Sequence, residues 1–438
     1  MWRSLTEHLP KWALYAFIVV LPFHNLLMAG LWDLGVRDVA LDVVSAWKEV
    51  LLALAIGAVV WRRRGIPFKS TSTDWLALAY AAFVLVYAAI PQDWLGGEAS
   101  ARGVLYGVRH DLTPVAAYVL GRGITLGRDD RRRIGLGLLG VAAVVAAWGL
   151  VDIYAVSLQT WRDSGVPGWF GEQLGLKYSP GLSGLPENWV YNLGDERPLR
   201  RLVSTFLSPL ATAYLLLVAI LLAATWQRSR WLSALTGLLA LGLLFTYSRT
   251  SIAALAVGLV ALAYALRSWW PVAAAAVFLA AAFFFVRAYP DLAPATRYTP
   301  AELKIQREGG QVERTSRGPF DPGESSFDSH LDSLRDGIEA VVTHPQGYGV
   351  GNAGVTAKRT GAPIKAGEST YTELGVELGL LGMLAFIAWS IALLRVTLRR
   401  APWLGASLAA VLALGIQTDV IGVHWLAFVV WALAGERA

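Results

Sequence analysis

The stretch that decides the fold closes a long polar segment and opens a long apolar one. It reads Ala366-Gly-Glu-Ser-Thr-Tyr-Thr-Glu-Leu-Gly-Val-Glu-Leu-Gly-Leu-Leu-Gly382, and apolar residues continue to about 394. An apolar run of this length is typical of a helix that crosses a bilayer. The carboxylate of Glu368 is therefore predicted to lie where a membrane helix meets water.

The composition extends this interpretation to the whole chain. Of 438 residues, 55% are hydrophobic and only 16% are charged, and the mean hydropathy is +0.48. Soluble proteins of this size carry far more charge. We predict an all-α polytopic membrane bundle of about 12 transmembrane helices, at 12–32, 44–61, 74–91, 104–121, 134–156, 202–225, 232–248, 250–266, 270–287, 371–394, 403–419 and 421–435.

Basic residues cluster in alternate short loops between these runs, for example Arg62-Arg63-Arg64 and Arg131-Arg132-Arg133. By the positive-inside rule, both termini are expected in the cytoplasm. The net charge of +6 thus indicates membrane orientation rather than nucleic-acid binding. The chain has no cysteine, which excludes disulfides and cysteine-based metal sites.

Two long segments then face the other side. The chain is expected to have three parts. Residues 1–287 form transmembrane helices 1–9 and include an outer loop at 157–201. Residues 288–370 form a large outer loop or lid, and residues 371–438 form helices 10–12. The lid is predicted to contain an amphipathic helix from Ser325-Ser326 to His344-Pro345, lying on the membrane surface or against the bundle. Its apolar stripe is Phe327, Leu331, Leu334, Ile338 and Val341.

Four arginines are expected at or near the outer membrane face: Arg109, Arg201, Arg249 and Arg335. An arginine at membrane depth is costly unless it is paired or lines a polar cavity, and guanidinium groups bind phosphate oxygens bidentately. Each also has a structural interpretation. Arg249 could reach water from a helix end, and Arg201 could belong to a charged patch with Arg197 and Arg200.

For Arg335, an ordinary pair with Glu339, Asp332 or Asp336 is the alternative to ligand binding. Arg109 could instead pair internally with Asp111, beside His110.

Glu368 is the candidate general base. The alternative is a role at the helix N-terminus, with Ser369 or Thr370 as the cap. The run His344-Pro-Gln-Gly-Tyr-Gly349-Val-Gly351 could bind a phosphate through backbone amides, or could simply end the preceding helix. The six histidines show no metal-ligand spacing, so neither a metal ion nor another cofactor is expected.

Four motifs together resemble the O-antigen ligase and polysaccharide polymerase superfamily, which are membrane glycosyltransferases of the GT-C type. They are Arg201 to Pro209, Thr246-Tyr-Ser-Arg249-Thr-Ser, Arg335 through His344-Pro-Gln-Gly-Tyr-Gly-Val-Gly351, and Glu368-Ser369 followed by Gly379-Leu-Leu-Gly382. The resemblance covers roughly 190–385, and the N-terminal spans only by topology.

The resemblance implies a bacterial inner-membrane enzyme whose site faces the periplasm. Its donor would be a glycan linked to undecaprenyl diphosphate, and its acceptor another glycan or lipid A-core, with a chain-length regulator as a further partner. Arg249 and Arg335 would act catalytically with Glu368, and the substrate-binding residues would be Arg201, Arg109, His344, Gly349, Gly351 and Tyr371.

The chain departs from the ligases at the start of the closing motif, where they carry the histidine taken as the base and this chain has Glu368. A suitably desolvated carboxylate performs the same proton transfer. His330 and His344 are not aligned with the missing histidine, although either could approach the site. We therefore favour an inverting polymerase, with a ligase as the alternative. A transporter or flippase, the rival class, is expected to show internal symmetry and facing broken helices.

Overall fold

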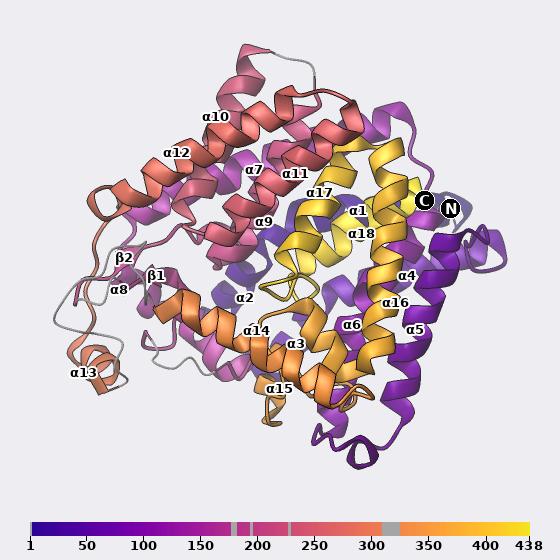
Figure 1. The fold of residues 1–438 in the computed structure, drawn as a ribbon, viewed down its shortest axis with the longest axis horizontal. Helices are drawn as coiled ribbons and strands as arrows, with labels where there is room; N and C mark the ends of the chain where they lie inside the picture. Colours follow the sequence, from indigo (N-terminus) through magenta and orange to yellow (C-terminus); the bar gives the residue numbers. More distant parts are fainter. Residues whose placement is uncertain (1, 177–181, 193–195, 227–228, 309–324) are drawn as a thin grey trace.

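The computed structural model describes residues 2–176, 182–192, 196–226, 229–308 and 325–438, and helices dominate it (Figure 1). The helices are α1 (Trp2–Val20), α2 (His24–Asp33), α3 (Asp38–Ser45), α4 (Trp47–Arg63), α5 (Ser72–Ala89), α6 (Ala101–Gly123), α7 (Arg128–Ala155), α8 (Leu158–Arg162), α9 (Pro209–Ala224), α10 (Arg230–Phe245), α11 (Arg249–Leu266), α12 (Trp270–Leu292), α13 (Pro300–Glu308), α14 (Ser325–Thr343), α15 (Gly354–Thr360), α16 (Thr370–Arg400), α17 (Pro402–Leu414) and α18 (His424–Arg437).

The remaining regular structure is small. Five short turns of 3-10 or π helix lie at Leu21–Phe23, Gln92–Leu95, Gly168–Gln173, Glu187–Trp189 and Ser204–Phe206. The strands β1 (Val190–Tyr191) and β2 (Leu199–Arg200) pair antiparallel. The expected all-α architecture is confirmed.

Six helical stretches of the described chain are long and apolar enough to cross a membrane: Thr6–Asp33, α5, α7, α11, α12 and α16. A seventh results if α3 and α4, which are bent by 40° against each other, form one span. Helices α9, α10 and α17 are apolar but shorter. The molecule is thus a helical membrane protein, and the expected twelve spans are not confirmed.

The apolar core lies around α9, α17 and α18. Nearly every residue of α9 is buried, and so is every residue from Trp425 to Gly435 of α18. A helix that is apolar on all sides is buried, either in a protein core or in a membrane. In Figure 1, α10 and α12 flank this core on one side, and α4 and α5 on the other.

Several of the basic loops lie at one end of the bundle, where they contact one another and the C-terminus. The ends of α4 and α6 meet through Arg62, which donates to the Gly123 carbonyl at 3.1 Å. Other contacts there are Lys11–Asp130 at 2.7 Å, Arg131–Glu436 at 3.0 Å, and Arg400 to the Ala438 carbonyl at 2.8 Å.

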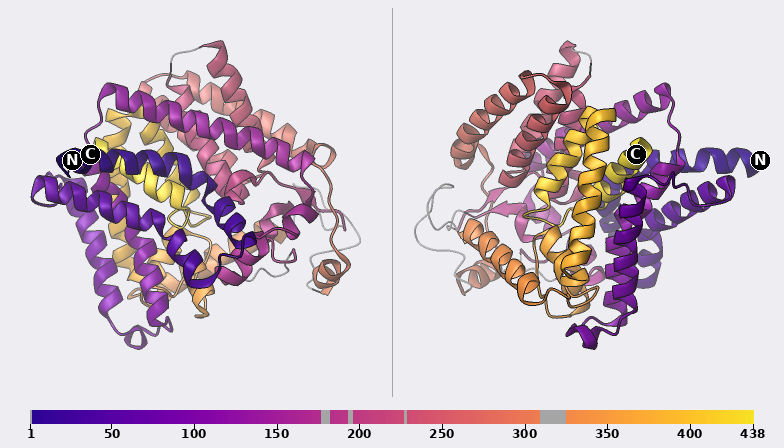
Figure 2. Two further views of the ribbon diagram at one scale, coloured as in Figure 1. Left: turned by 180° about the vertical axis from the view of Figure 1, so that it is seen from behind. Right: turned by 45° about the vertical axis from the view of Figure 1, so that its right-hand side comes forward.

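A kink in α16 fixes α14 against the bundle. Gly379 has φ 67° and ψ 175°, a conformation outside the helical region and open essentially only to glycine. On either side of it, the Val376 carbonyl accepts from the Tyr348 amide at 2.6 Å and the Leu380 amide donates to the Pro345 carbonyl at 2.8 Å. The turn that ends α14 is thereby bound to α16, and the right-hand view of Figure 2 shows α14 beside the start of α16.

Helix α14 lies within the stretch where the sequence predicts an amphipathic helix, and it packs against the bundle at Val341. Residues 309–324 of the expected lid, and the side chain of Phe327, lie outside the described part of the molecule. The helix expected from 202 begins instead at Pro209, because Ser204, at the start of a short 3-10 turn, and Leu207, just after it, adopt positive φ angles.

Candidate active site

A cavity of about 760 Å³ lies between α6, α14, α15 and the start of α16. It takes its walls from segments far apart in the sequence, including a loop after α17. Its polar lining residues include Tyr106, Arg109, His110, Ser333, Asp336, Lys358, Arg359, Lys365, Glu368, Glu373 and Asp419. A cavity of this size accommodates several sugar rings or a sugar with its diphosphate.

Glu368 lines this cavity at the point predicted from the sequence, immediately before a membrane helix. Its backbone has φ 70°, which is uncommon for a residue with a side chain. Neighbouring contacts hold this conformation: the Ser369 hydroxyl donates to the Gly415 carbonyl at 3.1 Å, and the Thr370 hydroxyl donates to the Thr418 carbonyl at 2.9 Å. Ser369 occupies the cap position, but its side chain makes no capping bond.

The carboxylate of Glu368 is hydrogen-bonded to an imidazole from another element. Oε2 lies 2.5 Å from Nδ1 of His330 on α14, and both side chains are 46% exposed. The bond to Glu368 raises the pKa of His330, while burial and the charges of Arg249 and Arg201 lower it. The charges of both arginines therefore act on the pair, although the residues that line the cavity include neither of them.

Arg201 is anchored to the turn before α11. Its Nε donates to the Thr246 carbonyl at 2.9 Å, and its Nη2 donates to the Tyr247 carbonyl at 3.5 Å. Burial, and secondarily the charge of Arg249, lowers the pKa of Arg201 to about 10. Arg249 is the first residue of α11, where the helix dipole adds further positive potential. Because like charges raise each other's energy, an anion bound here would relieve both.

Arg335 is not brought into this group. Its side chain is 76% exposed and lies 3.6 Å from Asp332 on the same helix. Gly337, two residues on, faces α16 instead, since a Cβ there would lie 2.8 Å from Cβ of Thr372. The alternative considered from the sequence, an ion pair between Arg335 and Asp332 on the same helix, is therefore present.

The glycine-rich run serves to attach α14 to the bundle. Gly349 and Gly351 have φ of 95° and 91° and lie against Gln92 and Gly103. The Gly351 amide donates to the carboxylate of Glu377 at 2.9 Å. His344 stacks on Tyr348 with ring centroids 4.3 Å apart. These contacts agree with the interpretation of the run as a turn that ends the helix.

Arg109 lines the cavity, but its partner is not Asp111. Its Nε donates to Glu49 of α4 at 2.9 Å, and the Arg109–Asp111 pair considered above is replaced by this contact. Tyr371 faces α17, where its hydroxyl donates to the Leu412 carbonyl at 2.7 Å.

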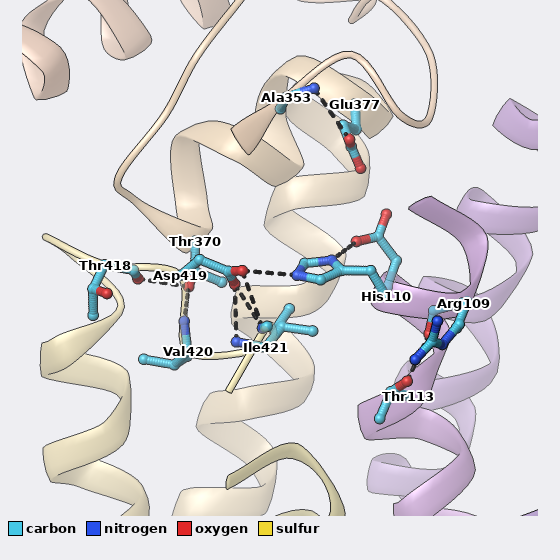
Figure 3. Close-up of polar contacts among 12 residues, drawn as sticks. Arg109, His110, Thr113, Ala353, Thr370, Glu377, Thr418, Asp419, Val420 and Ile421 are labelled. Carbon is cyan, nitrogen blue, oxygen red and sulfur yellow. Dashed lines mark hydrogen bonds and ion pairs between the residues drawn. The ribbon is translucent and has the colours of Figure 1, made fainter. Parts of the chain in front are cut away.

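A polar network forms part of the wall of the cavity, and sequence reasoning missed most of it. His110 lies between two carboxylates, with Nδ1 2.8 Å from Asp111 and Nε2 2.9 Å from Asp419. Figure 3 shows this imidazole bridging to Asp419, with Glu377 and Ala353 nearby. The available signal was the presence of Glu373, Glu377 and Asp419 within or beside apolar runs. No group of three or more His, Asp or Glu side chains in the described residues has the arrangement of a metal site.

Comparison with known proteins identifies the central part of the chain. Residues 234–387 match the O-antigen ligase family. The resemblance to the O-antigen ligase and polysaccharide polymerase superfamily is confirmed. The matched segment runs from α10 through the kink of α16, so it contains Arg249, α14 and Glu368. It supports glycosyltransferase activity of the O-antigen ligase or polymerase type. No curated protein matches the chain.

Proposed function

We propose that this protein polymerises polysaccharide repeat units, taking the growing glycan from undecaprenyl diphosphate and joining it to another lipid-linked repeat. The observation that carries this proposal is the His330–Glu368 pair: Glu368 lines the large cavity, and the charges of Arg201 and Arg249 act on His330. A base and a set of phosphate-binding cations are the two parts that such a transfer needs.

The chemistry follows from these groups. The pair takes the proton of the acceptor hydroxyl, whose oxygen attacks the anomeric carbon of the donor and inverts its configuration. The bond between that carbon and the diphosphate oxygen breaks, and the electron pair leaves with the lipid diphosphate. Arg201 and Arg249 stabilise the charge that develops on this leaving group. The glycosyl-diphosphate bond supplies the energy, so neither a nucleotide nor a metal ion has a role in this proposal.

The orientation has its own support. Several basic loops, together with the C-terminus, meet at one end of the bundle, and short basic loops favour the cytoplasm. Glu368, in contrast, belongs to the long polar segment between α12 and α16. We therefore assign the site to the periplasmic face of the inner membrane, where lipid-linked repeats and a chain-length regulator would reach it.

A ligase that transfers the glycan to lipid A-core is the second candidate, favoured by the family description of the matched segment. The two differ only in the acceptor. The Glu368 that replaces the ligases' histidine is our reason to prefer the polymerase.

The test is transfer by purified protein in detergent, with lipid-linked oligosaccharide as the sole substrate, in the presence and absence of EDTA. A ladder of lengthened lipid-linked glycans, unaffected by EDTA and formed much more slowly by Glu368→Gln, is expected. Product only after addition of lipid A-core would replace the polymerase with the ligase. Loss of activity in EDTA that Mg²⁺ restores would contradict the metal-free reaction.

A further inference from the structure

The hydrogen bond between His330 and Glu368 joins two segments that the sequence separates by 38 residues. We infer that His330 is the general base that contacts the acceptor hydroxyl, and that Glu368 is a positioning residue that acts through it. This inference rests on the proposed function and gives the two residues of the pair separate roles. It assigns the base to α14 rather than to the segment that opens α16.

The geometry of the bond supports this division. Nδ1 of His330 is occupied by Glu368 at 2.5 Å, so Nε2 is the ring nitrogen that remains to accept a proton. A carboxylate on Nδ1 fixes the tautomer in which Nδ1 carries hydrogen and Nε2 has its lone pair. The same carboxylate then stabilises the imidazolium that forms.

Both partners are held by contacts away from the bond. Glu368 keeps a φ of 70° because Ser369 and Thr370 are fixed to the loop after α17. On α14, His330 lies on the same face as Gly337 and Val341, which pack on α16. A carboxylate in a strained backbone conformation that meets a fixed imidazole indicates a built arrangement rather than a chance surface contact.

The proton and electron balance is simple. As the acceptor oxygen bonds to the anomeric carbon, its proton passes to Nε2 of His330. The electron pair of the broken carbon–oxygen bond leaves with the lipid diphosphate. The imidazolium, paired with Glu368, returns its proton to solvent before the next cycle.

The charges around the pair set the direction of the pH effects. The hydrogen bond to Glu368 raises the pKa of His330, and Arg249 and Arg201 oppose it. Glu187, in the 3-10 turn before β1, has a pKa that burial and the charge of Glu368 raise and the charge of Lys358 lowers. Because the neutral imidazole is the base, activity falls as the pH drops through the pKa of His330. Removing the charge of Glu368 lowers that pKa and moves the acidic limb to lower pH.

The experiment measures the pH profile of kcat for ladder formation by wild type, His330→Gln, His330→Ala and Glu368→Gln. His8→Gln, which removes another exposed histidine on α1, is the matched control and is expected to match wild type. We expect His330→Gln to lose about 10²–10⁴-fold in kcat and to lack the imidazole limb. Glu368→Gln should keep that limb, shifted to lower pH, at a reduced rate. Added imidazole should partly restore His330→Ala, which a variant that had merely misfolded would not show.

Two results would overturn the inference. His330→Gln with kcat within a few-fold of wild type would make Glu368 the base itself. An acidic limb in Glu368→Gln at the same pH as in wild type would remove the coupling between the two side chains. A wild-type protein inactive on every lipid-linked glycan, with or without lipid A-core, would instead overturn the proposed function and this inference with it.

Discussion

Replacement of Gly379 by alanine tests how the kink of α16 holds the site together. The backbone there has φ 67° and ψ 175°, and the added Cβ would lie 2.8 Å from the carbonyl oxygens of Gln346 and Pro345. Both neighbours are backbone atoms of the turn that ends α14, so they cannot rotate away as a flexible side chain would. Either the kink or the turn must move.

The cost follows from these contacts. Strain in this region of φ and ψ costs about 1–3 kcal/mol. If the turn moves, the bonds Tyr348 N–H to Val376 O and Leu380 N–H to Pro345 O are weakened, at about 1 kcal/mol each. We expect a loss of roughly 3–5 kcal/mol, or about 6–10 °C in Tm at about 2 °C per kcal/mol for a long chain. Because α14 carries His330, transfer activity should fall as well.

The assay is thermal unfolding in detergent, followed by the fluorescence of the 19 tryptophans. Gly140→Ala in α7 is the matched control, because the methyl group that it adds would have no other atom within 4 Å and the backbone there is helical. Alanine is favoured over glycine in a helix by up to about 1 kcal/mol, so the control should be unchanged or slightly more stable. Equal Tm values for Gly379→Ala and wild type would refute the reasoning.

Three further predictions concern other charged contacts. Arg249→Lys and Arg249→Ala should both lose about 10²–10³-fold in kcat, because a point charge cannot replace the guanidinium fork; a fully active lysine variant in the ladder assay would remove the bidentate role. Asp74→Asn should lower the free energy of unfolding by about 3–5 kcal/mol. Arg122 binds Asp74 through Nε and Nη2 at 2.8 and 2.9 Å, and both side chains are buried. An unchanged Tm in thermal unfolding would contradict this. Asp419→Asn should lower the free energy of unfolding by about 1–3 kcal/mol. The reason is that Asp419 accepts hydrogen bonds from His110 at 2.9 Å and from two backbone amides. A Tm equal to that of wild type would show that the network is not needed for stability.

The sequence predicts local structure well where one physical signal dominates. The apolar period indicated α14, and the polar-to-apolar change placed Glu368 just before α16. The sequence placed the break between two helices at Arg249, and the structure has it just before that residue, because α10 ends at Phe245 and α11 begins at Arg249. Each of these follows from residues within about one or two helical turns.

What the sequence could not predict depends on contacts between distant segments. Nothing near His330 indicates that its imidazole meets Glu368, and nothing near Arg109 indicates Glu49 as its partner. The predicted lengths of two helices were too long for a related reason. The chain turns at Leu207, just before α9, and at Gly415, just after α17, so both helices are shorter than the apolar runs that contain them. Arg335 was selected by its motif, but the face it occupies is set by how α14 packs.

The most direct test of the central claim is the stoichiometry of transfer. Purified protein would be given a lipid-linked oligosaccharide, and the free undecaprenyl diphosphate released would be counted against the new glycosidic bonds. We predict one lipid diphosphate for each bond, with the opposite anomeric configuration at the new linkage. Glycan that crosses a reconstituted bilayer with its diphosphate bond intact, and without release of lipid diphosphate, would contradict the account and favour a transporter.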